Sequence, residues 1–282
     1  MSFLESIDKN RLQKILLVVI AALVLALLVC LVVIIISGIT PPAPTPNDTD
    51  FELKDYTLTD KDVNTGSLIL ADTNHPYTYQ IDANDLIGCG QYRNENLPTN
   101  DAGETINKYY MNDTSNMKLT ANAMAYAHNM LVAAEAAVMK DDLLIEYAYG
   151  YVGDSEEYKT ALLIALANFD GEKLDGAYSE WFASNAAKYG FIQSFEDAYR
   201  YVGEVHAKYM TDEKLTLANY IDFLKKNTNC DKAITVKIGD AKYSVYYAEG
   251  KSGDTVKVPA TAEYTVSGTN EGGIIVTVKN AK

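Results

Sequence analysis

The sequence predicts an α+β fold, in which a central, mainly antiparallel sheet has helices on one side and an all-β appendage follows. Three observations predict it. Residues 121–139 have the periodicity of an amphipathic helix, residues 142–151 have the pattern of a strand, and short alternating strands follow from Ala233 onward. The chain has 282 residues, which suits one domain of ordinary size with additional segments.

The N-terminal part has the pattern of a membrane anchor, which we place at residues 15–37. Residues 15–36 are an unbroken run of 22 apolar residues, and about 20 residues cross a bilayer core as a helix. Residues 1–14 carry a net charge of +1, and no Lys or Arg follows the run until Lys54. The positive-inside rule then predicts a cytoplasmic N-terminus and an extracellular domain. A cleaved signal peptide would have a shorter apolar core, and a lipoprotein would need a small residue before Cys30.

A proline-rich spacer is expected after the anchor, at residues 38–55. Four of the six residues from 41 to 46 are prolines, which disfavour helix and sheet and favour an extended chain. We place the main domain at 56–230 and the small β domain at 231–282.

Within the main domain, the first expected element is a short apolar strand at 67–71, followed by a turn that contains Pro76. Four helices are expected. They are residues 121–139 with Thr120 as the N-cap, 155–169 capped by Asp154 or Ser155, 179–189 closed by Gly190, and a helix that Thr216 caps. The β domain should contain five strands, at 233–238, 242–248, 255–260, 263–268 and 273–279.

The net negative charge of the chain limits the kinds of partner that it could bind. The chain carries a formal net charge of −14, so the part beyond the anchor carries −15. Nucleic acid and anionic lipid headgroups would be repelled, although acidity of this kind often only keeps a protein soluble. The chain has 21 Tyr, and tyrosine-rich surfaces can bind sugars and peptides. Cys89 and Cys230 lie beyond the anchor, and whether they form a disulfide stays open.

Several segments resemble one family. The helix-and-turn segment at 181–192 (WFASNAAKYGFI) and the segment at 200–226, which begins RYVGEVHAKYM, are similar to VanY-type zinc D-alanyl-D-alanine carboxypeptidases. Residues 65–79 and the strand-rich tail resemble clostridial members, so the resemblance spans about residues 60–280. It implies a hedgehog/DD-peptidase-like domain and a Gram-positive bacterium as the source.

In the family, a His and an Asp on an S-x-H-x-x-G-x-A-x-D segment and a second His on a Glu-Pro-Trp-His turn hold Zn²⁺, and the Glu of that turn is the general base. An Arg in an S-G-Y-R turn binds the substrate carboxylate. The matching positions in this chain are Leu162 and Phe169 for the first pair, Ala198 for the second His, Phe195 for the base and Val152 for the Arg. The resemblance therefore predicts no zinc, no other cofactor and no catalytic residue.

The resemblance also suggests side chains that could border a groove. They are Tyr149, Tyr151, Trp181, Glu196, Arg200 and His206. Glu196 is the nearest substitute for the base, but an exposed loop carboxylate is the favoured interpretation. For His206 we expect a structural hydrogen bond, because family members often have a His there that does not bind zinc.

Two hypotheses follow. The first is a membrane-anchored pseudoenzyme that binds peptidoglycan stem peptide, or a membrane or cell-wall protein. The second is an active D,D-carboxypeptidase with a rebuilt site that trims stem peptides. A decaying gene copy without function is a third interpretation. No sequence feature suggests a nucleic-acid partner.

Overall fold

The computed structural model describes most of the chain beyond the predicted anchor. The described residues are 46–89, 117–140, 142–150, 155–168, 172–174 and 176–280. They belong to one compact unit, Thr45–Lys282. In these ranges, no helix is both long and apolar enough to span a bilayer. The predicted anchor and cytoplasmic tail lie outside the described residues, so their placement stays a prediction.

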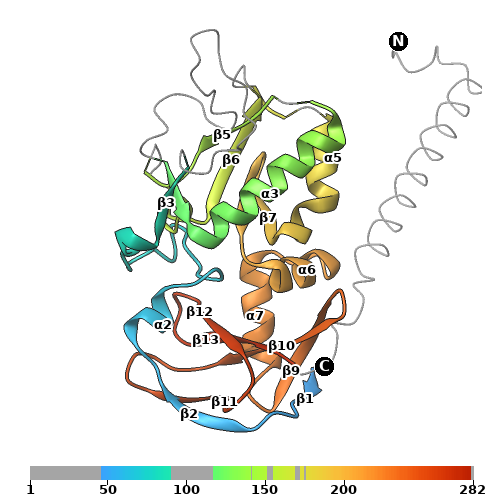
Figure 1. Cartoon of the computed structure of the whole chain (residues 1–282). Coiled ribbons are helices and arrows are strands. Elements are labelled where there is room, and N and C mark those ends of the chain that lie inside the picture. The colour runs from blue at the N-terminus through green and yellow to red at the C-terminus, as the bar shows by residue number, and fades with distance from the viewer. Residues whose placement is uncertain are drawn as a thin grey trace, which may run out of the picture. The chain divides into compact units, whose positions relative to one another are not determined.

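A four-stranded antiparallel sheet forms the centre of the first layer, in the order β5-β6-β8-β7 (Figure 1). Its strands are β5 (Leu143–Tyr147), β6 (Leu163–Asn168), β7 (Phe191–Phe195) and β8 (Ala198–Tyr201). Helices α3 (Ala121–Val138) and α5 (Gly176–Asn185) cover one face of this sheet and share a buried core with it. The 3-10 helix η4 (Ala186–Tyr189) continues α5 and ends at Gly190, whose φ of 79° is left-handed.

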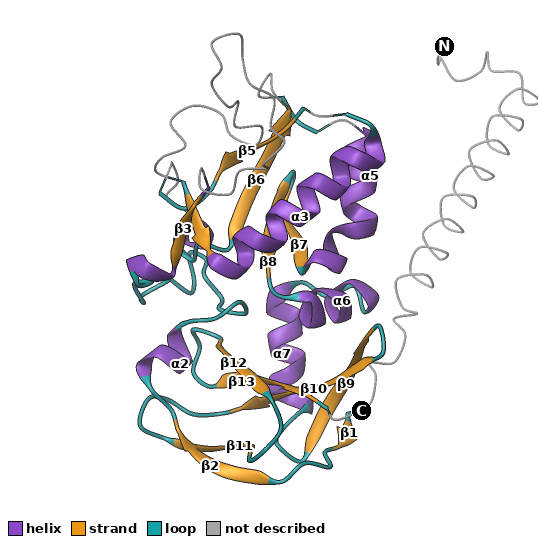
Figure 2. Cartoon of the chain, viewed as in Figure 1, coloured by secondary structure: helices purple, strands orange, loops and turns teal. Residues whose placement is uncertain are grey.

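A five-stranded antiparallel sheet forms the second layer, in the order β1-β9-β10-β13-β12. Its strands are β1 (Asn47–Asp48), β9 (Lys232–Ile238), β10 (Ala241–Ala248), β12 (Tyr264–Gly268) and β13 (Ile274–Lys279). Helices α6 (Glu204–Asp212) and α7 (Leu217–Asn227) pack against this sheet and lie between the two layers (Figure 2).

Shorter elements complete the described fold. They are β2 (Leu53–Thr57), which pairs with β11 (Thr255–Pro259), β3 (Leu86–Gly88), which pairs with β4 (Lys118–Thr120), and the short helices α2 (Asp60–Asn64), η2 (Ala83–Asp85) and α4 (Glu156–Lys159).

Many predicted elements are confirmed. The antiparallel sheet with helices on one face is present, as are all five C-terminal strands. The helix at 121–139 is α3, and the Thr120 hydroxyl accepts a hydrogen bond from the Ala123 amide. Thr216 caps α7 in the same way, through the amide of Asn219. These segments have local patterns that agree with their tertiary environment.

The helix predicted at 155–169 is wrong. Only α4 is helical there, and β6 follows it. Ala161, with a φ of 56°, separates the two elements. Each residue of β6 from Leu163 to Ala167 is buried. A strand that is buried on both faces shows no alternation, so its apolar run cannot be distinguished from a buried helix by periodicity.

The strand predicted at 67–71 is also wrong, since this segment is buried coil. Its backbone is bonded to other segments instead of a neighbouring strand. The Leu68 amide donates to the Ser267 hydroxyl at 2.8 Å, and the Leu70 amide donates to the Thr269 carbonyl at 3.0 Å. Such irregular partners satisfy buried backbone groups without any sequence signal for them.

The structure also bears on the predicted spacer and on the possible disulfide. The C-terminal part of the predicted spacer is paired, because β1 and β2 are edge strands against β9 and β11. Cys89 and Cys230 are free thiols in two different cores, with Cys89 under α3 and Cys230 against the five-stranded sheet.

The contact between β12 and α2 can be tested at Gly268. A Cβ at this position would overlap the backbone carbonyl of Val63, so Gly268→Ala should lower the free energy of unfolding by about 2 kcal/mol or more. Gly176→Ala is the matched control, because it has open space around it at the start of α5. It should leave stability unchanged or raise it slightly. Urea unfolding measures both, and equal midpoints for the two variants would contradict the close approach.

Candidate functional site

The face of the four-stranded sheet away from α3 and α5 contains a small apolar cluster. Ala165 on β6 lies directly opposite Ala198 on β8, and both are buried beside Leu163. Tyr147 and Tyr158 pack against these three residues, which we call the sheet-face cluster. Ala198 is the position that holds the second zinc-binding His in the resembled family. The place of that ligand is therefore occupied by hydrocarbon.

Arg200 lies on the same strand as Ala198 and is completely buried. Its Nη1 donates to Glu157 Oε2 at 2.8 Å, and its Nη2 donates to the carbonyl of Ile69. Glu157 belongs to α4, the helix that also supplies Tyr158. The ion pair therefore fixes α4 over the sheet-face cluster and fixes the segment around Ile69 beside it. A buried charge tolerates this position only when it is paired and hydrogen-bonded.

The remaining family positions do not form a donor set. Leu162 is buried in the core beneath α3, and Phe195 is 54 % exposed at the end of β7. Phe169 and Val152 lie outside the described residues. Within the described ranges, no group of three or more His, Cys, Asp and Glu side chains could hold a metal ion. The side chains at positions 162 and 198 have no lone pair to offer, so the residues in place do not fit zinc.

The suggested groove residues are dispersed. Glu196 is exposed in the β7–β8 turn and pairs with Lys173 at 2.6 Å, as its favoured interpretation predicted. Trp181 packs on the helical side, edge-on against Phe182. Tyr149 forms a bridge with Lys118, and Tyr151 lies outside the described residues. Arg200 is buried as described above, so those of the suggested residues that the structure describes do not line one groove.

The expected structural hydrogen bond of His206 is confirmed. Its Nδ1 lies 2.9 Å from the Tyr220 hydroxyl, and its Nε2 lies 3.0 Å from the Thr277 hydroxyl. These contacts connect α6 to α7 and β13. Both ring nitrogens are occupied, and burial lowers the pKa of His206 to about 3. The ring is therefore neutral at physiological pH and has no free nitrogen for a metal.

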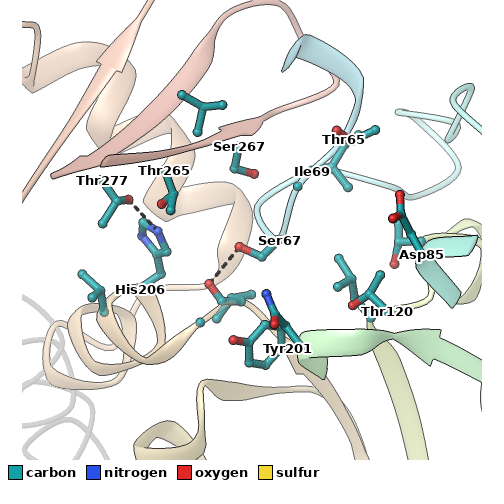
Figure 3. A pocket seen from close by; sticks show the side chains of 18 of the residues that line it. Thr65, Ser67, Ile69, Asp85, Thr120, Tyr201, His206, Thr265, Ser267 and Thr277 are labelled. Atoms are coloured by element: carbon teal, nitrogen blue, oxygen red, sulfur yellow. Dashed lines mark hydrogen bonds between the residues drawn. The ribbon is translucent and has the colours of Figure 1, made fainter. Parts of the chain in front are cut away.

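A cavity of about 720 Å³ lies beside this histidine. It is bounded by the starts of α3 and α6, by the segment around Ser67 and by β12 and β13. Figure 3 shows Thr265 and Ser267, from the five-stranded sheet, across the cavity from Tyr201 and Thr120. The Ser67 hydroxyl donates to the Val202 carbonyl at 3.1 Å, which ties two walls together. Of the predicted site residues, only Leu162 and His206 line this cavity among the residues that the structure describes.

Sequence reasoning missed the aromatic side chains that line the cavity. Five tyrosines do so, namely Tyr77, Tyr79, Tyr201, Tyr243 and Tyr264. Tyr77 and Tyr79 lie in one segment, and the other three come from β8, β10 and β12, so no single spacing connects all five. The high tyrosine content was the one available signal, and it does not distinguish these five from the others.

Comparisons with known proteins agree with this architecture. The chain is 26% identical over 257 residues to a D-alanyl-D-alanine carboxypeptidase of Enterococcus faecium, which covers 80% of this chain and 79% of that protein. The crystal structure of the vancomycin-resistance D,D-dipeptidase VanXYg, with a D-Ala-D-Ala phosphinate analogue, is similar at a TM-score of 0.61 and 18% identity. That match covers 81% of this chain and 100% of that chain. VanYB in complex with D-Ala-D-Ala matches 55% of this chain and 97% of its own, at 18% identity and a TM-score of 0.38. No family model matches the chain.

The fold is thus the mixed α/β fold of the D,D-peptidases. Together with the sequence match, it confirms the predicted resemblance to VanY-type D-alanyl-D-alanine carboxypeptidases.

The buried His206 predicts a pH dependence of stability. An unperturbed His has a pKa near 6.5, whereas His206 in the fold has a pKa of about 3. Between these values the unfolded chain binds more protons, so the free energy of unfolding should decrease as the pH falls from about 6.5 toward 3. His206→Gln should be less stable at pH 7 by about 1–3 kcal/mol, because it breaks buried hydrogen bonds, and should lose less stability on acidification. Thermal unfolding at several pH values measures both, and parallel pH profiles would contradict the prediction.

The Arg200–Glu157 pair predicts a coupled loss of stability. Arg200→Met should lower the free energy of unfolding by about 3–5 kcal/mol, because it leaves a partly buried carboxylate without its partner. The double variant Arg200→Met, Glu157→Leu should recover part of this loss, since no unpaired charge remains. Lys173→Met is the control for an exposed pair and should change little. Urea unfolding of the wild type, these three variants and the single variant Glu157→Leu measures the coupling, and a double-variant loss equal to the sum of the two single losses would contradict it.

Proposed function

We propose that this protein is a membrane-anchored, extracellular pseudoenzyme of the D-alanyl-D-alanine carboxypeptidase family, which binds cell-wall material without hydrolysing it. The observation that carries the proposal is the pairing of Ala165 with Ala198 in a buried apolar cluster. In the family pattern, a zinc ligand occupies the second of these positions. In this chain the same position is occupied by an apolar side chain that packs within the sheet.

The loss of hydrolysis follows from the missing parts of the reaction. A zinc peptidase lowers the pKa of a metal-bound water, and a carboxylate then removes the water's proton. Phe195 stands at the position of that carboxylate and is exposed to solvent. Glu196, the next residue, is paired with Lys173 in the solvent. A carboxylate in this place has no activated water to act upon.

The cellular location is part of the proposal. The apolar run at 15–36 would anchor the chain in the cell membrane, and the charges around it favour a cytoplasmic N-terminus. The proline-rich segment up to Pro46 would hold the compact unit away from the bilayer. An extracellular domain in this position could reach peptidoglycan or a cell-wall protein.

The ligand class is supported by relatives. The enterococcal relative is a D-alanyl-D-alanine carboxypeptidase, and VanXYg binds a D-Ala-D-Ala analogue. We propose peptidoglycan as the ligand, through its stem peptide or through another part of the same polymer. A cell-wall protein would be the partner if peptidoglycan does not bind.

Metal and activity assays of the compact unit, residues 45–282, test the proposal. We expect less than about 0.1 zinc equivalents per chain after purification in zinc-containing buffer, because the donor set is absent. We also expect no release of D-Ala from a pentapeptide, while calorimetry with peptidoglycan fragments should show binding. The enterococcal carboxypeptidase, assayed in parallel, is the positive control for D-Ala release.

The contrary outcomes are distinct. Zinc near one equivalent together with D-Ala release would establish a rebuilt active site and overturn the pseudoenzyme proposal. Absence of binding to every peptidoglycan fragment would overturn the proposed ligand and favour a protein partner or a decaying gene copy.

A further inference from the structure

The cavity beside His206 is separate from the sheet-face cluster. The three residues of that cluster do not line the cavity, and Tyr158 covers the cluster from α4. The Arg200–Glu157 pair holds α4 in this position. The three residues of the cluster are buried, with Tyr147 and Tyr158 packed against them, so this face is not open to a ligand in the described structure. The cavity offers about 720 Å³, within the range of about 300–1,000 Å³ that small-molecule sites have.

The tyrosines give the cavity walls a particular chemistry. Each of the five presents an apolar ring face and a hydroxyl group. Burial raises the pKa of Tyr77 to about 12 and raises the pKa of Tyr201 further, so both phenols are neutral at physiological pH. Neutral phenols can donate and accept hydrogen bonds. Threonine and serine hydroxyls, such as those of Thr265 and Ser267, add further groups of the same kind.

The positive and negative charges of the side chains that line the cavity nearly cancel. Lys61 and Lys279 line it together with Asp85, Glu204 and Glu263. Lys279 is 3.5 Å from Glu263, and Glu204 accepts from the Tyr126 hydroxyl at 3.5 Å. No arginine is among the lining residues in the described part of the chain. A peptide carboxylate is commonly recognised by the bidentate guanidinium of an arginine, which these walls do not supply.

A sugar ring matches these walls better than a peptide terminus does. Its hydroxyl groups require many neutral hydrogen-bonding partners, and its C–H faces pack on aromatic rings. Pyranose rings without charge also avoid the repulsion that an acidic extracellular domain imposes on anions. We propose that the cavity binds a glycan segment of the cell-wall polymer, namely N-acetylated amino sugars. The choice of amino sugars among carbohydrates rests on the proposed function.

Calorimetry on the full-length chain tests this inference, in a detergent without a sugar headgroup. The probes are N,N′-diacetylchitobiose, cellobiose and the dipeptide D-Ala-D-Ala. We expect diacetylchitobiose to bind, and cellobiose to bind about tenfold more weakly because it has no acetamido groups to pair with the cavity. The dipeptide should not compete with diacetylchitobiose.

A cavity-filling variant locates the site. The Thr265 side chain points into the cavity from β12, so Thr265→Trp should lower the association constant for diacetylchitobiose about tenfold or more. Thr255→Trp is the matched control, since Thr255 is exposed on β11 and does not line the cavity. Thermal unfolding checks that both variants fold. If Thr265→Trp does not fold, Tyr79→Ala provides the same test at another lining residue, by removing one aromatic ring.

Each contrary result has one meaning. Absence of binding to both disaccharides overturns the glycan inference, and the proposed function is then judged separately by its stem-peptide calorimetry. Equal binding of cellobiose overturns the choice of amino sugars. Unchanged diacetylchitobiose binding by a folded Thr265→Trp variant overturns the cavity as the site.

Discussion

The burial of Arg200 is the constraint on which much of this structure depends. A guanidinium with no solvent exposure must be compensated, because an unpaired buried charge costs several kcal/mol. Glu157 provides the opposite charge and the Ile69 carbonyl provides a second acceptor. These partners come from segments that are far apart in the sequence. The first covers the sheet-face cluster, and the second forms a wall of the cavity. The buried guanidinium of Arg200 therefore positions both α4 over the sheet-face cluster and the Ile69 segment in the wall of the cavity.

The fold could be predicted where local pattern and tertiary environment agree. Helix α3 has a cap at Thr120 and one continuous buried stripe, and the C-terminal strands alternate between turns. The prediction failed at β6, where burial on both faces removes the alternation that identifies a strand. It also failed at 67–71, whose partners are the Ser267 hydroxyl, the Thr269 carbonyl and the Arg200 side chain. A segment held by such distant and irregular partners has no signature of its own.

The family's ligand positions and the cavity beside His206 also differ in how far the sequence could identify them. The replaced ligand positions could be identified in the sequence, because the flanking segments at 181–192 and 200–226 fix the register of Ala198. In the structure Ala198 pairs with Ala165 within a buried apolar cluster, so this position packs against its neighbouring strand. The cavity could not be identified in this way. Its tyrosines come from separate loops and strands, and only the folding of the five-stranded sheet against α6 brings them together. His206 connects these elements, since it bonds to Tyr220 on α7 and to Thr277 on β13.

The buried sheet-face cluster and the cavity beside His206 agree with the proposed binding role, which does not require hydrolysis. A zinc site needs charged ligands that are held at fixed distances, and a single apolar replacement abolishes it. A tyrosine-lined cavity depends on many weak contacts, so the loss of one contact weakens binding without removing the site. The cavity also lies at the junction of the two layers, and the contacts that form it also stabilise the fold: the Ser67–Val202 bond and the His206–Thr277 bond. Selection for a stable junction would then preserve the shape of the cavity, whereas nothing in the packing of the sheet preserves a metal ligand at position 198.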